Sequence, residues 1–122
     1  MSETIKPNYE TRAWLLMRYS SLLLIPLVWI HVLWQDVITG VHNIDTNYVL
    51  QRWSNIGIQI YDILLLAFAF AHGMNGLRQV LMDYIHSDNA RKTTSTIIFI
   101  LWIAISTMGG IAIIAAAKAH LQ

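Results

Sequence analysis

The sequence predicts an all-α integral membrane protein with three transmembrane helices. Of its 122 residues, 56% are hydrophobic and only 12% are charged, which is about half the charged fraction of a soluble domain. Three stretches are also apolar for roughly the 17 to 25 residues that a helix needs to span a bilayer. We expect helices at about residues 13–36, 57–85 and 95–118, within a single membrane domain covering residues 1–122.

Composition excludes several classes of site and partner. The net charge of +1 gives no sign of a nucleic-acid partner. The chain has no cysteine, so it forms no disulfide, all-cysteine zinc site or thiolate-bound iron–sulfur cluster by itself. It also contains neither a Gly-x-Gly-x-x-Gly nucleotide loop nor a phosphate-binding P-loop.

The first span follows a polar segment, residues 1–12, that we expect to be a short tail. Between Arg18 and Asp36 no group is charged if His31 is neutral, which gives about the minimum length for a span. Arg18 can extend that length by reaching its guanidinium to the interface. A cleaved signal peptide is a weaker alternative, because Arg18 and His31 interrupt the apolar run and no Ala-x-Ala-like site follows.

The second and third spans are separated from the first by a connector at residues 36–54. Within it, residues 48–53 have the pattern of a short interfacial helix. The second span ends in a polar segment at residues 83–92, and residues 96–117 of the third contain no charge. The third span is therefore the clearest of the three.

The basic residues predict the orientation. The N-terminal side and the second loop carry Lys6, Arg12, Arg18, Arg78, Arg91 and Lys92. The other side carries only Arg52 and Lys118. Because basic residues favour the cytoplasmic side, we expect a cytoplasmic N-terminus and an external C-terminus.

One stripe of the second span combines ionisable groups with membrane depth. At about 100° per residue, His72, Gly76, Gln79 and Asp83 lie within roughly 60° of one another. An imidazole at this depth must be neutral and must find a partner. With Gly73 and Gly76 leaving room for a flat group, haem iron is one such partner. A hydrogen bond to a neighbouring helix, with the glycines serving close packing, explains the pattern equally well.

Three further residues have more than one interpretation. His31 could bind iron, or it could hydrogen-bond a neighbouring helix or line a wet crevice. Arg18 and Arg78 could pair with haem propionates or lipid phosphates, or they could serve only as topology signals.

The end of the second span suggests a quinone site. The Tyr84 phenol could hydrogen-bond a quinone carbonyl and Asp83 could help supply protons, although an aromatic-belt tyrosine and a solvated aspartate are the simpler explanation. Ser21 could reach a quinone or bond to its own helix. Gly109 and Gly110 favour helix packing in the third span.

The run His72-Gly-Met-Asn-Gly-Leu-Arg-Gln-Val-Leu-Met-Asp83-Tyr84 resembles the smaller membrane-anchor subunit of succinate dehydrogenases. In that family a haem-binding histidine precedes an Asp-Tyr pair on the second of three helices. The run Arg18-Tyr-Ser-Ser is similar to the start of the family's first helix. The resemblance covers about residues 12–92, and the third helix matches only in hydropathy.

The resemblance implies that His72 is an axial ligand of haem b, with the other ligand on a second membrane-anchor subunit. It implies that Asp83 and Tyr84 border the quinone site and that Arg18 lies near the propionates. His31 is similar to the first-helix histidine of two-haem forms, so one or two haems are expected.

The implied complex adds an iron–sulfur subunit and a flavoprotein subunit on the cytoplasmic side of a bacterial inner membrane, where the chain also contacts lipid. A quinol:fumarate reductase anchor and a haem-free structural subunit are the alternatives.

Overall fold

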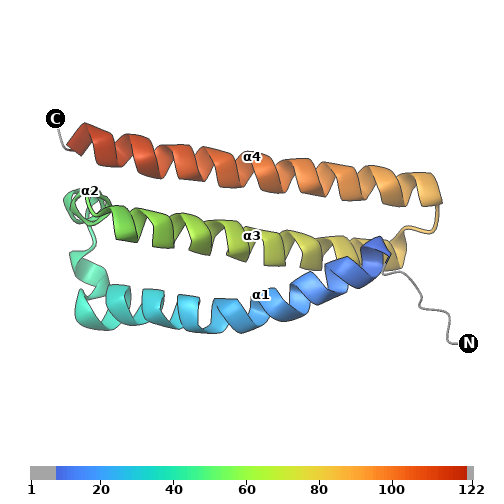
Figure 1. Ribbon diagram of the computed structural model, residues 1–122, viewed down its shortest axis with the longest axis horizontal. Helices are drawn as coiled ribbons and strands as arrows, with labels where there is room; N and C mark the ends of the chain where they lie inside the picture. Colours follow the sequence, from blue (N-terminus) through green and yellow to red (C-terminus); the bar gives the residue numbers. More distant parts are fainter. Residues whose placement is uncertain (1–7, 121–122) are drawn as a thin grey trace, which may run out of the picture.

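The computed structural model describes residues 8–120, with His120 placed by its backbone only, and this part of the chain contains helices and no strand (Figure 1). In order these are α1 (Tyr9–Val32), η1 (Leu33–Ile38), η2 (Val41–Asn43), α2 (Thr46–Trp53), α3 (Ile56–Tyr84) and α4 (Asp88–His120). The segments Tyr9–Ile38, Ile56–Tyr84 and Asp88–Ala119 are long and apolar enough to cross a membrane. The predicted all-α membrane protein with three spanning helices is thus confirmed.

Side-chain caps fix where three of the helices begin. The Asn8 side chain accepts a hydrogen bond from the Thr11 amide (2.9 Å), so α1 begins four residues ahead of residue 13, where the span was expected to start. Asp45 caps α2 in the same way, and Asn55 caps α3. The residues we expected to form a tail are therefore helical from Tyr9 onward.

The third long helix also begins earlier than the predicted span. It starts at Asp88 rather than near residue 95, and an acidic residue in the first turn is favourable there. Arg91 donates hydrogen bonds to the carbonyl oxygens of Ile85 (2.7 Å) and Met82 (2.8 Å). These bonds tie the first turn of α4 to the end of α3 and shorten the loop between them.

The connector after the first span is partly helical. α1 continues into the π-helical turn η1. Gly40 then adopts a φ of 82°, a left-handed conformation that favours glycine, and lets the chain turn back. The short helix expected at residues 48–53 is present as α2, and its interfacial position stays a prediction.

The three long helices form a layer with α3 between α1 and α4 (Figure 1). A Cβ atom at Gly109 would collide with the Leu66 side chain, so glycine allows α4 to approach α3 closely, as the packing interpretation expected. The Trp102 indole donates to the Ala67 carbonyl (3.1 Å), and on the other side of α3 the Tyr61 hydroxyl donates to the Leu27 carbonyl.

The layer has little core of its own. Within residues 8–120 the buried apolar residues are Ala13, Ile98, Ile113 and Ala117. Large side chains such as Trp29 and Met108 are about 70% exposed. Apolar surface of this extent suits lipid or further helices.

The two ends of the layer carry different polar groups. The Tyr84 end contains the start of α1, the end of α3 and the start of α4. The α2 end contains η1, α2 and the start of α3. All predicted site residues lie at one of these ends or on the helices between them.

Candidate functional site

His72 on α3 faces Ser20 on α1. The Ser20 hydroxyl oxygen lies 3.0 Å from His72 Nδ1 and 3.3 Å from the Met17 carbonyl oxygen. The serine hydroxyl has one proton, which it can donate either to the Met17 carbonyl or to His72 Nδ1. In the first arrangement it accepts from Nδ1–H, and Nε2 of the neutral ring carries the lone pair.

The surface of α3 beside His72 is open. A Cβ at Gly73 would meet no atom within 4 Å, whereas one at Gly76 would contact the Met17 methyl at 3.5 Å. Five exposed residues, Ala69, Gly73, Leu77, Val80 and Tyr84, lie within about 80° of one another around the helix. We call these five residues the open face of α3, and His72 borders it.

Asp83 and Tyr84 lie at the end of this open face. Tyr84 is 77% exposed and Asp83 is exposed as well. Neither side chain makes a hydrogen bond to another residue of the described chain. Both are therefore available to a bound molecule or to water.

Arg78 is part of an ion-pair cluster between α1 and α3. It is 2% exposed, and it donates to both carboxylate oxygens of Glu10, at 3.0 and 2.9 Å. Its Nε donates to Asn75 (3.1 Å), whose amide donates to the Ala13 carbonyl (3.0 Å). The Tyr9 ring lies 5.1 Å from the guanidinium carbon. In this chain Arg78 thus holds the start of α1 against α3.

Arg18 and Ser21 lie one turn of α1 apart. The Arg18 guanidinium is exposed and stacks over the Trp14 ring, 5.5 Å from its centroid. The Ser21 hydroxyl donates to the Met17 carbonyl of its own helix and contacts the Arg18 carbonyl oxygen at 3.2 Å. The structure therefore gives Ser21 the helix-bonded arrangement and leaves Arg18 free to meet an anion.

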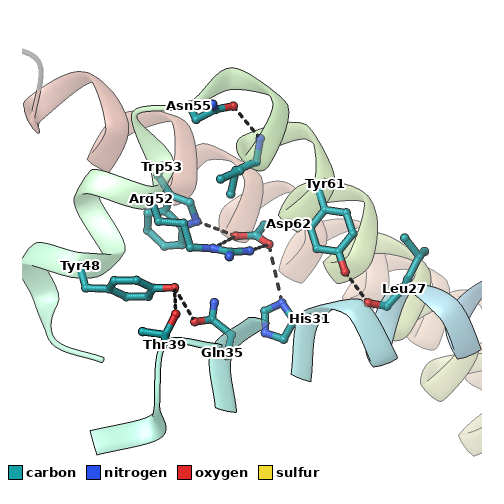
Figure 2. Close-up of polar contacts among 11 residues, drawn as sticks. Leu27, His31, Gln35, Thr39, Tyr48, Arg52, Trp53, Asn55, Tyr61 and Asp62 are labelled. Atoms are coloured by element: carbon teal, nitrogen blue, oxygen red, sulfur yellow. Dashed lines mark hydrogen bonds and ion pairs between the residues drawn. The ribbon is translucent and has the colours of Figure 1, made fainter. Parts of the chain in front are cut away.

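His31 lies at the α2 end, in a polar cluster around Asp62 (Figure 2). The Asp62 carboxylate accepts from Arg52 at 2.7 and 3.3 Å and from the Trp53 indole at 2.9 Å. His31 Nδ1 is 3.8 Å from Asp62. It is a buried nitrogen with no hydrogen-bond partner within the described residues, although the side chain as a whole is 37% exposed.

The same cluster ties α2 to the end of the first span (Figure 2). The Tyr48 hydroxyl lies 3.0 Å from Gln35 Oε1 and 2.9 Å from the Thr39 hydroxyl. Burial lowers the pKa of the Arg52 guanidinium, but its hydrogen bond to Asp62 and the carboxylate charge raise that pKa, and the net shift is upward. Arg52 is therefore charged at any physiological pH.

The two candidate iron ligands are well separated. His72 contacts Ser20 of α1, and Ser20 lies about 16 Å from His31 along the axis of that helix. Across residues 8–120 there is no group of three or more His, Asp or Glu side chains that could hold a metal ion. Each histidine can thus offer a single ligand, and the two do not meet in one site.

Sequence reasoning identified the candidate residues but did not pair them with three of their partners: Ser20, Glu10 and Asp62. Asp62 carried a usable signal, because it is a charged residue within an otherwise apolar run. No signal in the sequence indicated that Glu10 pairs with Arg78, since Glu10 precedes the predicted span. The pairing of Ser20 with His72 depends on how α1 and α3 lie against each other, which periodicity does not specify.

Comparison with known proteins assigns the chain to a family. A family model described as the succinate dehydrogenase/fumarate reductase transmembrane subunit matches residues 2–111. No curated protein gives a significant match to the chain. The family match covers all of α1 to α3 and most of α4, including every candidate site residue. The chain therefore belongs to the family of transmembrane subunits of succinate dehydrogenases and fumarate reductases.

Proposed function

We propose that this chain is the haem b-binding anchor of a succinate dehydrogenase, holding the iron–sulfur and flavoprotein subunits to a bacterial inner membrane. In this function it helps form the site where electrons from succinate reduce quinone. The observation that carries the proposal is the position of His72, whose Nδ1 contacts Ser20 and whose ring borders the open face of α3. The motif from His72 to Tyr84 supports succinate dehydrogenase over its relatives.

The environment of His72 fits haem iron. Histidines that bind metals usually donate their other ring N–H to a fixed partner, and Ser20 is such a partner for Nδ1. The absent side chain of Gly73 leaves space for a flat ring system. His72 would hold the iron, with a further ligand from the second anchor subunit. Bound there, haem supplies a one-electron redox centre within the membrane.

Arg18 is the better placed of the two arginines for a propionate. Its guanidinium is exposed and makes no ion pair with another described residue. Arg78 would have to share donors already used by Glu10 and Asn75. His31 stays a proposed ligand of a second haem because its side chain is 37% exposed.

Tyr84 and Asp83 are proposed to bind the quinone head group. Reduction of a quinone takes two electrons and two protons. The electrons come from succinate through the partner subunits. The Tyr84 hydroxyl would donate a hydrogen bond to a quinone carbonyl, and Asp83 would hold a proton at the water interface. Ser21 could contribute only by exchanging its bond to Met17 for one to the quinone.

The substitution Tyr84→Phe tests this function, because it removes one hydroxyl and keeps the ring. Loss of a hydrogen bond to the substrate costs about 1–3 kcal/mol, so we expect quinone reduction by the purified complex to fall by roughly 5- to 150-fold. Succinate oxidation with a soluble artificial acceptor should be unchanged, since that reaction does not use the membrane site.

Tyr48→Phe is the matched control, because it removes a tyrosine hydroxyl at the opposite end of the layer. It should leave quinone reduction intact. The quinone assignment would be wrong if Tyr84→Phe lowered both activities together, or if it lowered neither. A purified complex without the haem Soret band would favour a haem-free structural subunit instead.

A further inference from the structure

Two adjoining cavities lie at the Tyr84 end, on the side of α3 where the start of α1 approaches α4. The first has a volume of about 350 Å³. Its apolar lining includes Leu16, Ala71, Met74, Ile98, Phe99 and Trp102. The second, of about 620 Å³, shares Tyr9, Ser95 and Phe99 with the first. From Ser95 to Trp102 the lining extends about 10 Å along α4, long enough for the first part of an acyl chain.

Three polar groups of the first cavity are already used within the chain. Arg78 is held by Glu10 and Asn75, and Asn75 donates to the Ala13 carbonyl. The Trp102 indole donates to Ala67. These bonds reduce the donors that the cavity offers to a quinone carbonyl, whereas a hydrocarbon chain needs none. The other polar lining residues are Tyr9 and Ser95, which the second cavity shares, and Arg12.

The mouth of the cavities is basic. Arg12 lines the first cavity, and Arg91 and Lys92 line the second. All three are exposed. The one acidic lining residue, Glu10, is paired with Arg78. A molecule with an apolar tail and a negative head would thus meet complementary surfaces at both of its ends.

These cavities are separate from the open face of α3. The α3 residues that line the first cavity are Ala71, Met74, Asn75 and Arg78. At 100° per residue, they are centred about 150° around the helix from the open face defined above. A molecule in the cavities would therefore occupy the opposite side of α3 from Gly73 and Tyr84.

We propose that this pair of cavities binds one anionic phospholipid, with an acyl chain in the first cavity and the phosphate at Arg12, Arg91 and Lys92. The bound lipid would fill the gap between α1 and α4 that no side chain fills. It would also add to the contacts that hold the start of α1 in place. This site does not depend on haem or on the quinone assignment.

The test is native mass spectrometry of the whole detergent-purified complex with added phosphatidylglycerol or phosphatidylcholine. The double variant Arg12→Gln/Lys92→Gln should weaken phosphatidylglycerol binding by about 5-fold per removed charge and leave phosphatidylcholine binding unchanged. Lys118→Gln removes a charge at the other end and should have no effect. Arg91 is left intact, because it holds the loop between α3 and α4.

A second variant tests the cavity itself. Ser95 lines both cavities, so Ser95→Phe should fill them and lower the binding of both lipids. Thr93→Phe, on the same helix but in neither cavity, should not. The proposal is overturned if the parent complex has no preference for phosphatidylglycerol, or if each variant behaves like its control. It is also overturned if added ubiquinone displaces the lipid, or if inorganic phosphate alone competes with it.

Discussion

Ser20 determines which nitrogen of His72 is available. Its hydroxyl contacts Nδ1, so Nε2 is the ring nitrogen that Ser20 leaves unengaged. We expect the serine to donate to the Met17 carbonyl and to accept from Nδ1–H, so that it orients the ring as a hydrogen-bonded partner does in many metal sites.

Ser20→Ala is predicted to weaken haem binding. Loss of such a supporting group typically lowers affinity by about 10- to 100-fold, so the variant complex should lose haem on dilution or dialysis, measured by absorbance at the Soret band. Ser21→Ala is the matched control, since the Ser21 hydroxyl bonds only to its own helix. Equal haem retention in the two variants would contradict this role for Ser20.

At the scale of single residues, sequence reasoning identified the functional side chains but not the residues with which they interact. His72 stood out because imidazole is rare at membrane depth. That Arg78 is paired with Glu10 could not be predicted, because the pair joins residues far apart in the chain across a helix contact. Asp62 could have been singled out from its position alone.

At the scale of the helices, Asp62 connects three elements. Its carboxylate accepts from Arg52 and Trp53 of α2, it belongs to α3, and His31 of α1 lies beside it. The Arg52 and Asp62 side chains are only 7% and 11% exposed. Removing one partner of such a pair leaves the other charge buried without compensation.

Asp62→Asn is therefore predicted to destabilise the α2 end. The expected loss is about 3 kcal/mol in the free energy of unfolding, measured by thermal or denaturant unfolding of the purified complex. Asp36→Asn, which changes an exposed aspartate without an ion pair among the described residues, should cause little change. If the two variants were equally stable, the cluster would contribute no stability.

The ends of the helices were harder to predict than their existence. Hydropathy marks the part of a helix that lies in lipid, so it located all three spans. The additional turns of α1 and α4 are polar, and they depend on the Asn8 cap and on the Arg91 bonds to the α3 end. The length of an apolar run does not predict these local polar contacts.

At the scale of the whole molecule, the helical layer exposes apolar surface that lipid or further helices must cover. A layer of three helices leaves both sides of α3 open except where α1 and α4 touch it, and most large apolar side chains are exposed. The sequence predicted a membrane protein for this reason, since the composition exceeds what a chain of this size can bury. It could not predict the layer, because helix order in space depends on contacts such as Gly109 with Leu66.

The orientation of the layer is also a prediction. Six basic residues lie on the side of the N-terminus and the second loop, and two lie on the other side. This asymmetry predicts that the N-terminus and the Tyr84 end face the cytoplasm. A reporter fused after Gln122 should therefore behave as external. A cytoplasmic signal from that fusion would reverse the orientation and move Asp83 and Tyr84 to the wrong side for the proposed partners.

The most direct test of the account is the haem content of the complex, measured by the pyridine haemochrome method in the parent and in His72→Ala, His31→Ala and His86→Ala. The exposed His86 is the control and should have no effect. Assembly is checked by succinate oxidation with a soluble acceptor. We predict that His72→Ala loses a haem that the parent contains. A second haem lost only in His31→Ala would extend the scheme to two haems, whereas no loss there would make His31 a residue of the Asp62 cluster alone. Full haem retention in an assembled His72→Ala complex would contradict the central claim.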